Sequence, residues 1–214
     1  FKCFKSLTLH SKIVISSTLV LIFGGALLIF LFEYNNVNTI GALNIFDKIQ
    51  VSMFQSITTR TAGFATIPQE SLTDQSVIVC LILMFIGGSP VGTAGGIKTI
   101  TAVSLVAIAI ASVRNKKEVV LFNRNLSSEI TRKAVAVTTM SFMILIISTI
   151  LLSLTIDRSI VDILYETASA TATVGLSRNL TPFLTNLGKI IVIVTMYLGR
   201  VGPISLAIAF KSQK

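Results

Sequence analysis

Long apolar stretches alternate with short polar segments along this chain. Between Lys12 and Glu33 lie 20 residues without a charge, and between Lys133 and Asp157 lie 23. A helix of about 20 apolar residues is long enough to cross the ~30 Å hydrocarbon layer of a membrane. The pattern therefore predicts spanning helices over residues 13–32 and 134–156.

A shorter amphipathic run follows each predicted span, over residues 47–58 and 159–170. About twelve residues form a helix of ~18 Å, which is too short to cross the membrane. Asp47 and Asp162 place carboxylates near the positive ends of these helices. We predict two pore helices that enter the membrane and return, so that their negative C-terminal ends favour a cation.

The stretch from Gln75 to Val113 carries a single charge, Lys98, in 39 residues. One unbroken helix of this length would measure ~58 Å, about twice the hydrocarbon thickness. Residues 87–96 read GGSPVGTAGG, and glycine costs ~1 kcal/mol and proline ~3 kcal/mol at a helical position. We predict a broken helix over 75–113, interrupted inside the membrane, and a last helix over 190–210.

A short motif after each pore helix is repeated. Residues 58–64 read TTRTAGF and residues 170–176 read ATATVGL, so Thr-x-Thr-x-Gly recurs 112 residues later. The elements around both motifs come in the same order, which indicates two copies of one unit. The predicted fold is an all-α membrane protein with pore units at 1–113 and 134–214, joined by a basic loop at 114–133.

The repeated motif is typical of an ion filter. In a filter, successive backbone carbonyls replace the water shell of an alkali ion, and glycine permits the left-handed torsion that aligns them. The alternative is that small residues merely allow two helices to pack closely. Two copies at matching positions favour filters over 59–64 and 171–176, and we expect the side chain of Arg60 to leave the ion path. The candidate ion-binding residues are Thr59, Arg60, Thr61, Ala62, Gly63, Thr171, Ala172, Thr173, Val174 and Gly175.

The glycine-rich interruption has a functional and a structural interpretation. It is not a phosphate-binding loop, because Ile97 separates Gly96 from Lys98 and the segment lies in an apolar span. It is either an intramembrane gate beneath the filter, which we favour, or a hinge that kinks the helix. Arg200 is then an electrostatic barrier below the filter or a cap for loop carbonyls. The candidate gate residues are Gly87, Gly88, Gly92, Thr93, Ala94, Gly95, Gly96, Lys98 and Arg200.

Composition agrees with a membrane location, since 52% hydrophobic and 13% charged residues are too apolar for a soluble domain. Eleven Lys and Arg residues lie in the two termini and the 114–133 loop, and five lie on the opposite side. The positive-inside rule makes the termini and the loop cytoplasmic. The net charge of +9 therefore reflects orientation and does not indicate nucleic acid. Cys3 and Cys80 fall at opposite faces, so we expect two free thiols. Glu166 on the second pore helix either orders the filter or is a surface charge, and both interpretations stay open.

Three segments together closely resemble one known family. SITTRTAGFATI, GGSPVGTAGGIKT and YLGRVGP are similar to the pore-forming subunit of the Trk/Ktr potassium-uptake systems, and within them to the KtrB-like members, which include the sodium-ATPase J subunits. The resemblance covers essentially the whole chain and implies pore units arranged pseudo-fourfold around a pore. It assigns filter glycines to Gly63 and Gly175, the gate to residues 87–98 and a pore-blocking arginine to Arg200.

The resemblance also implies a function and partners. These are K+ uptake, with Na+ dependence in many members, a homodimer in the cell membrane with several spans per chain, and gating by a cytoplasmic ring of nucleotide-binding subunits. K+, with Na+ as a second candidate, is the transported ion, and no covalent cofactor is implied. The family carries four units on a longer chain, whereas the two here match the third and fourth. We therefore expect a missing N-terminal half or a second copy, and we favour the fragment.

Other classes of function are weaker. A secondary cation symporter with broken helices usually has inverted halves, whereas both units here run in the same direction. The membrane subunit of a cation-pumping complex should carry a carboxylate relay, which the predicted spans lack. A non-transporting scaffold has no need of re-entrant glycine segments. No nucleophile triad, metal-ligand cluster or catalytic carboxylate pair is visible in the sequence, so we predict no enzyme.

Overall fold

The computed structural model describes residues 7–89, 95–115, 118–121 and 124–202, and this part of the chain is all-α apart from one small hairpin. The all-α prediction is therefore confirmed. The first unit contains α2 (Leu9–Glu33), α3 (Ile45–Thr58), η1 (Gln69–Ser71), α4 (Asp74–Phe85) and α5 (Thr99–Val113). The second contains α6 (Ser128–Ser153), α7 (Ile160–Thr171), η2 (Thr181–Phe183) and α8 (Asn186–Val201). Between them, β1 (Val120–Leu121) pairs with β2 (Arg124–Asn125) in an antiparallel hairpin.

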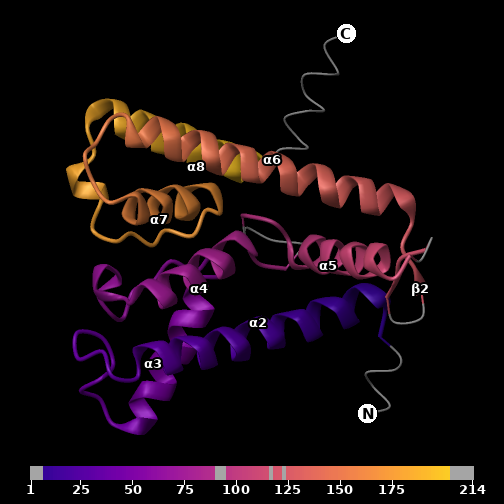
Figure 1. The fold of residues 1–214 in the computed structure, drawn as a ribbon, viewed down its shortest axis with the longest axis horizontal. Coiled ribbons are helices and arrows are strands. Elements are labelled where there is room, and N and C mark those ends of the chain that lie inside the picture. The colour runs from indigo at the N-terminus through magenta and orange to yellow at the C-terminus, as the bar shows by residue number, and fades with distance from the viewer. Residues whose placement is uncertain (1–6, 90–94, 116–117, 122–123, 203–214) are drawn as a thin grey trace.

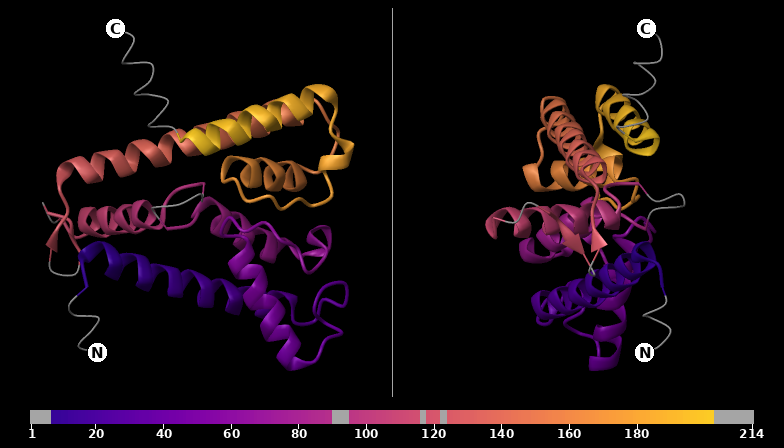
Figure 2. Two further views of the ribbon diagram at one scale, coloured as in Figure 1. Left: turned by 180° about the vertical axis from the view of Figure 1, so that it is seen from behind. Right: turned by 90° about the vertical axis from the view of Figure 1, so that its right-hand side faces the viewer.

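Helices α2 and α6 are long and apolar enough to cross a membrane. They run along the long axis of the molecule, and the starts of both lie at the end that carries the hairpin (Figure 1). The short helices α3 and α7 lie towards the opposite end, and the view from behind shows the same arrangement (Figure 2). Phe23, Leu27 and Leu31 on α2 are between 56% and 58% exposed, as expected of side chains that face lipid or another apolar surface.

Helix α6 begins six residues before the predicted start at position 134 and ends at Ser153 instead of 156. Its first turn is polar: the Ser127 hydroxyl accepts a hydrogen bond from the Ile130 amide, and Lys133 pairs with Glu129 at 2.6 Å. Hydropathy located the apolar part of this helix but not its charged first turn. This corrects the limits predicted for both the helix and the 114–133 loop, which also contains the hairpin.

Two other helices begin four residues earlier than predicted, for the same reason. Thr8 caps α2 and Thr185 caps α8, and each hydroxyl accepts a backbone N–H within the first turn. The helices therefore start at Leu9 and Asn186 and not at 13 and 190. The part of the last predicted helix that follows residue 202 lies outside the described residues.

The main apolar core lies between the two units. It combines side chains of α2 and α4 and of the first unit's outer loops with side chains of α7 and the segment after it. Its buried members are Ile29, Ile40, Ile67, Leu72, Val77, Cys80, Leu83, Met84, Tyr165, Ala172, Val174 and Leu176. Because both units contribute, the core fixes the second pore helix against the first unit.

A buried carboxylate at the end of α2 fixes the outer loops of the first unit. Glu33 is 0% exposed and accepts hydrogen bonds from Asn36 (2.7 Å), from Thr39 (2.6 Å) and from the amide and hydroxyl of Thr73 (2.8 and 2.7 Å). Thr73 is the N-cap of α4. The charge that ends the apolar run in the sequence therefore joins α2 to the start of α4.

Candidate ion pathway

The two Thr-x-Thr-x-Gly turns share an unusual backbone. Thr61 and Gly63 have φ values of 70° and 80°, and Thr173 and Gly175 have values of 54° and 100°. A β-branched residue rarely adopts positive φ, and a residue held there costs on the order of 1–3 kcal/mol. The same left-handed pair at matching positions makes the sequence repeat a repeat of backbone conformation as well.

Each turn is tied to the end of the short helix before it. The Thr58 hydroxyl accepts a hydrogen bond from the amide of Phe64 (2.8 Å), and the Ser169 hydroxyl accepts one from the amide of Gly175 (3.1 Å). In both cases the amide lies six residues after the hydroxyl. The carbonyl ends of α3 and α7, which carry partial negative charge, therefore point at the turns.

The two turns lie against each other. A β-carbon added to Gly63 would overlap the carbonyl oxygen of Val174 and would lie 3.4 Å from the α-carbon of Gly175. Only a residue without a side chain fits at position 63 in this arrangement. The close approach brings the backbone carbonyls of both turns to one place.

The remaining predicted filter residues fall into two groups. The hydroxyls of Thr59 and Thr171 donate to helix carbonyls, at 2.9 Å to Ser56 and 2.8 Å to Thr167, so these side chains face back into α3 and α7. Ala62 is exposed. Ala172 and Val174 are buried in the core between the units, at 1% and 5% exposed. What these residues offer an ion is backbone carbonyls and not side chains.

The side chain of Arg60 extends from the first turn into surrounding structure, towards the interrupted helix. Its Nη2 donates a 3.2 Å hydrogen bond to the carbonyl of Gly87. The Nε of the same guanidinium is buried and has no hydrogen-bond partner in the described part of the chain. Arg60 therefore contributes its carbonyl to the turn and its charge to the interruption.

The interruption between α4 and α5 forms a neck whose two ends touch. Ile86 pairs with Ile97, and the Ile97 amide donates to the carbonyl of Phe85 at 3.1 Å. A β-carbon on Gly87 would overlap the carbonyl of Gly95. The amide of Thr99 also donates to Gly88 at 3.3 Å.

The interruption also contacts the second turn. A β-carbon on Gly95 would overlap the hydroxyl of Thr173 and would lie 2.6 Å from the carbonyl oxygen of Ala172. The predicted gate residues Gly92, Thr93 and Ala94 lie outside the described residues. The described ends of the interruption therefore lie directly beside the filter turns.

Lys98 and Arg200 lie at the edge of this region. Lys98 is the N-cap of α5, and Arg200 lies in the last turn of α8, close enough for the two charges to interact. Gly199, next to Arg200, packs against the end of α7, where a β-carbon would overlap the carbonyl oxygen of Thr171. Arg200 itself is exposed in this half of the pore.

Glu166 orders the segment that follows the second turn. The side chain is 6% exposed and accepts hydrogen bonds from the hydroxyls of Ser177 (2.6 Å) and Thr181 (2.5 Å). Of the two interpretations left open by the sequence, the ordering carboxylate fits this geometry.

Arg178 joins the two units, a role that the sequence did not reveal. Its Nε pairs with Asp162 at 2.7 Å, and its terminal nitrogens donate to the carbonyls of Gln69 (2.8 Å) and Glu70 (3.2 Å). From sequence it counted only as one of five outer-side charges. The only available signal was its place directly after the second motif.

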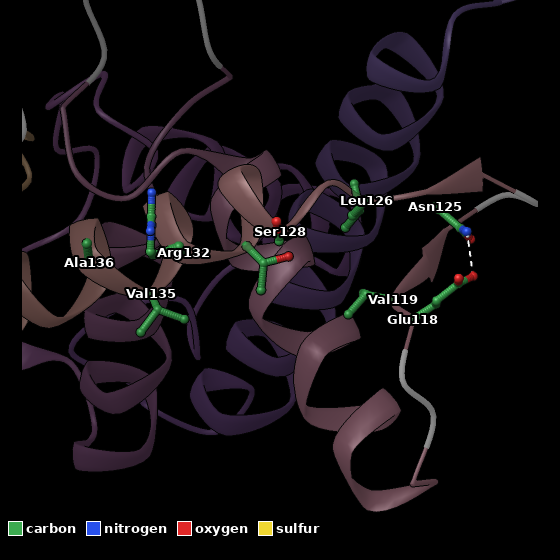
Figure 3. A pocket seen from close by; sticks show the side chains of 9 residues that line it. Glu118, Val119, Asn125, Leu126, Ser128, Arg132, Val135 and Ala136 are labelled. Atoms are coloured by element: carbon green, nitrogen blue, oxygen red, sulfur yellow. Dashed lines mark hydrogen bonds between the residues drawn. The ribbon is translucent and has the colours of Figure 1, made fainter.

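A hollow of about 700 Å³ lies beside the hairpin, far from the turns (Figure 3). Val119, Leu126 and Val135 supply its apolar wall, and Glu118 accepts a 2.5 Å hydrogen bond from Asn125 at one side. Its place at the hairpin end separates it from the candidate ion pathway.

Comparisons with known proteins agree with a transport site. A family model described as TrkH, cation transport protein, matches residues 1–214. The chain is 41% identical to Ktr system potassium uptake protein B of Bacillus subtilis over 207 residues, which cover 97% of this chain and 46% of the relative. It is 37% identical to the protein of the same name from Vibrio alginolyticus, over 96% of this chain and 45% of that one.

Two further matches extend the comparison. Identity to the potassium/sodium uptake protein NtpJ of Enterococcus hirae is 34%, over 92% of this chain and 45% of the relative. The solved structure of the potassium transporter TrkH from Vibrio parahaemolyticus superposes with a TM-score of 0.76 over 91% of this chain and 43% of that chain. At 17% identity this match shows the fold alone. The chain spans less than half the length of these relatives.

Proposed function

Because this chain belongs to the TrkH family of cation transport proteins, we propose that it supplies two of the four filter segments of a potassium-conducting pore. The family consists of transporters and not of enzymes. The relatives from Bacillus subtilis and Vibrio alginolyticus are named as potassium uptake proteins, which supports K+ as the ion. In this proposal K+ moves passively, down its electrochemical gradient, into the cell.

One observation carries the proposal: both turns hold a threonine and a glycine in left-handed conformation at matching positions. Such torsions allow neighbouring carbonyls to face the same side, as replacement of an ion's water shell requires. Two turns in mutual contact, each at the negative end of a short helix, add partial charges of the right sign. The ion-binding groups are the backbone carbonyls of residues 59–63 and 171–175.

Na+ is the second candidate ion. A relative from Enterococcus hirae is named as a potassium/sodium uptake protein. Each turn also contains a single glycine, so fewer carbonyls are held in line than in a filter with more glycines. We propose modest discrimination between K+ and Na+, and we propose no covalent cofactor.

The interruption between α4 and α5 serves as the gate in this proposal. Its ends contact the second turn through Gly95 and the first turn through Gly87 and Arg60. A segment without helix at this depth must lie against protein or water. Lys98 and Arg200 add positive charge beneath the turns, which opposes cation leak.

The exposed side of the second unit supports completion of the pore by further units. In the first unit, α4 is covered by Tyr165 and Leu176 of the second unit. In the second unit, the equivalent space between α7, its turn and α8 is a cavity of about 290 Å³, lined in part by Glu166, Val192 and Met196. A neighbouring unit would fill this cavity as Tyr165 fills its counterpart.

The other half comes either from the missing N-terminal part of the same polypeptide or from a second copy, and we favour the first. We further propose a homodimer in the cell membrane with several spans per chain, cytoplasmic termini and a cytoplasmic ring of nucleotide-binding regulatory subunits. The Lys and Arg residues of the 114–133 loop support this orientation under the positive-inside rule.

The proposal is tested by K+ uptake in cells that lack their own potassium transporters. The chain is expressed alone and together with the N-terminal half of a relative. Uptake only with the added half supports a single-chain pore of four units, and uptake by the chain alone supports assembly of two copies. Absence of uptake in both, with both proteins present in the membrane, would contradict the transport function.

A further inference from the structure

Arg60 and Ala172 occupy equivalent positions in the two turns, and both contact the interruption. Arg60 donates to the carbonyl of Gly87, where the chain leaves α4. The β-carbon of Ala172 lies 3.4 Å from the position of a β-carbon on Gly96, where the chain returns towards α5. The interruption is therefore held between the same position of the two turns.

The two positions differ in chemistry. Ala172 shows that a turn with this backbone forms without an arginine, because Thr173 and Gly175 repeat the left-handed torsions of the first turn. Arg60 places a half-buried guanidinium against one neutral carbonyl and leaves its Nε without a partner in the described part of the chain. Such a charge at membrane depth is costly. Formation of the turn alone does not explain it.

Direct contacts connect Arg60 to the second turn through the neck. Gly87, which accepts the bond from Arg60, packs against the carbonyl of Gly95. Gly95 in turn packs against the hydroxyl of Thr173. A movement of Gly87 therefore displaces the part of the interruption that lies beside the second turn.

We propose that Arg60 is a positioning residue that latches the interruption to the first turn, through its hydrogen bond to the carbonyl of Gly87. Loss of this bond frees the neck to leave the ion path, so the rate of ion flow depends on it. The turn itself keeps its shape, because its own hydrogen bonds do not involve the guanidinium. This inference rests on the proposed potassium pathway.

The test is Rb+ uptake by the full-length transporter that contains this chain, measured as a function of Rb+ concentration. For Arg60→Ala we expect the maximal rate to rise by up to about tenfold, the equivalent of one charged hydrogen bond. KM should stay within about twofold, because the carbonyls are unchanged. Arg60→Lys keeps a charged donor on a different stem and should fall between the two. Arg158→Ala removes an exposed arginine that stacks on Phe183, and it should match the wild type.

A double-mutant comparison separates a latch from a direct effect of the charge on passing ions. Shortening the 87–96 segment removes the object that the latch holds, so Arg60→Ala should then add no further flux. Multiplied effects would contradict the latch. A changed KM at unchanged maximal rate, or a lower rate at normal membrane abundance, would also contradict it. Wild-type protein without uptake would refute the proposed function, whereas active wild type with an unaltered Arg60→Ala variant refutes only the latch.

Discussion

The hydroxyl of Tyr165 donates a 2.8 Å hydrogen bond to the side-chain oxygen of Gln69, across the boundary between the two units. Both residues are buried, at 0% and 3% exposed. The Gln69 amide also exchanges bonds of 2.7 and 3.2 Å with Gln55 of the first pore helix. The two pore helices are thus joined by a buried polar network, and two of the filter turns are positioned within this chain.

Arg178 provides a second link across the same boundary, and its removal should destabilise the protein. Arg178→Ala leaves Asp162 and two carbonyls of the first unit without their charged partner. Breaking a partly buried pair of this kind costs about 3 kcal/mol, which should lower the thermal unfolding midpoint of the full-length transporter in detergent. Arg158→Ala is the matched control and should unfold with the wild type. Equal midpoints for Arg178→Ala and wild type would mean that the link does not stabilise the contact between units.

The two filter glycines should differ in their tolerance of a side chain. Both have positive φ, so Gly175→Ser strains the backbone by about 1–2 kcal/mol, and apparent K+ affinity or selectivity should fall by about tenfold. Gly63→Ser meets the same strain and also the carbonyl of Val174, whereas the nearest atom to a β-carbon at Gly175 is 3.7 Å away. Uptake kinetics should therefore be more impaired in Gly63→Ser. Unchanged kinetics in both variants would count heavily against the filter.

Shortening the 87–96 segment tests the gate directly. A shorter connection cannot keep Gly95 against Thr173, so Rb+ flux through the full-length transporter should rise several-fold at equal membrane abundance. If the segment is only a hinge, the altered angle between α4 and α5 should lower flux in a protein that still folds. The sign of the change decides between the two interpretations.

Neutralisation of Glu166 should loosen the segment after the second turn. Gln in its place keeps one oxygen for the hydroxyls of Ser177 and Thr181, which the carboxylate now serves with two. Loss of one bond to a charged group costs about 1.5–3 kcal/mol. We expect a weaker preference for K+ over Na+ in reversal-potential measurements. Glu70→Gln alters an exposed carboxylate and serves as the control, and equal selectivity in the two variants would assign Glu166 to packing.

Much of the architecture follows from local features of the sequence. Apolar length identified α2 and α6, and the cluster of glycines with Pro90 located the interruption between α4 and α5. Repetition of Thr-x-Thr-x-Gly predicted two equivalent turns, because the left-handed conformation at Gly63 and Gly175 is one that glycine adopts readily.

The contacts between segments could not be predicted in this way. Arg178 and Glu33 gain their roles from partners on other elements, and no local pattern names those partners. The left-handed threonines Thr61 and Thr173 run against the preference of β-branched residues, so propensity alone would have rejected them. Hydropathy also missed the polar first turn of α6, where capping by Ser127 and a charge pair extend the helix.

The central claim is that backbone carbonyls of the two turns hold the transported ion. The most direct measurement is anomalous scattering from Rb+ in crystals of the full-length transporter, because it locates the ion without mutation. The account predicts Rb+ density beside the carbonyls of residues 59–63 and 171–175, above the 87–96 interruption. Density confined to other parts of the protein, with these carbonyls unoccupied at saturating Rb+, would contradict it.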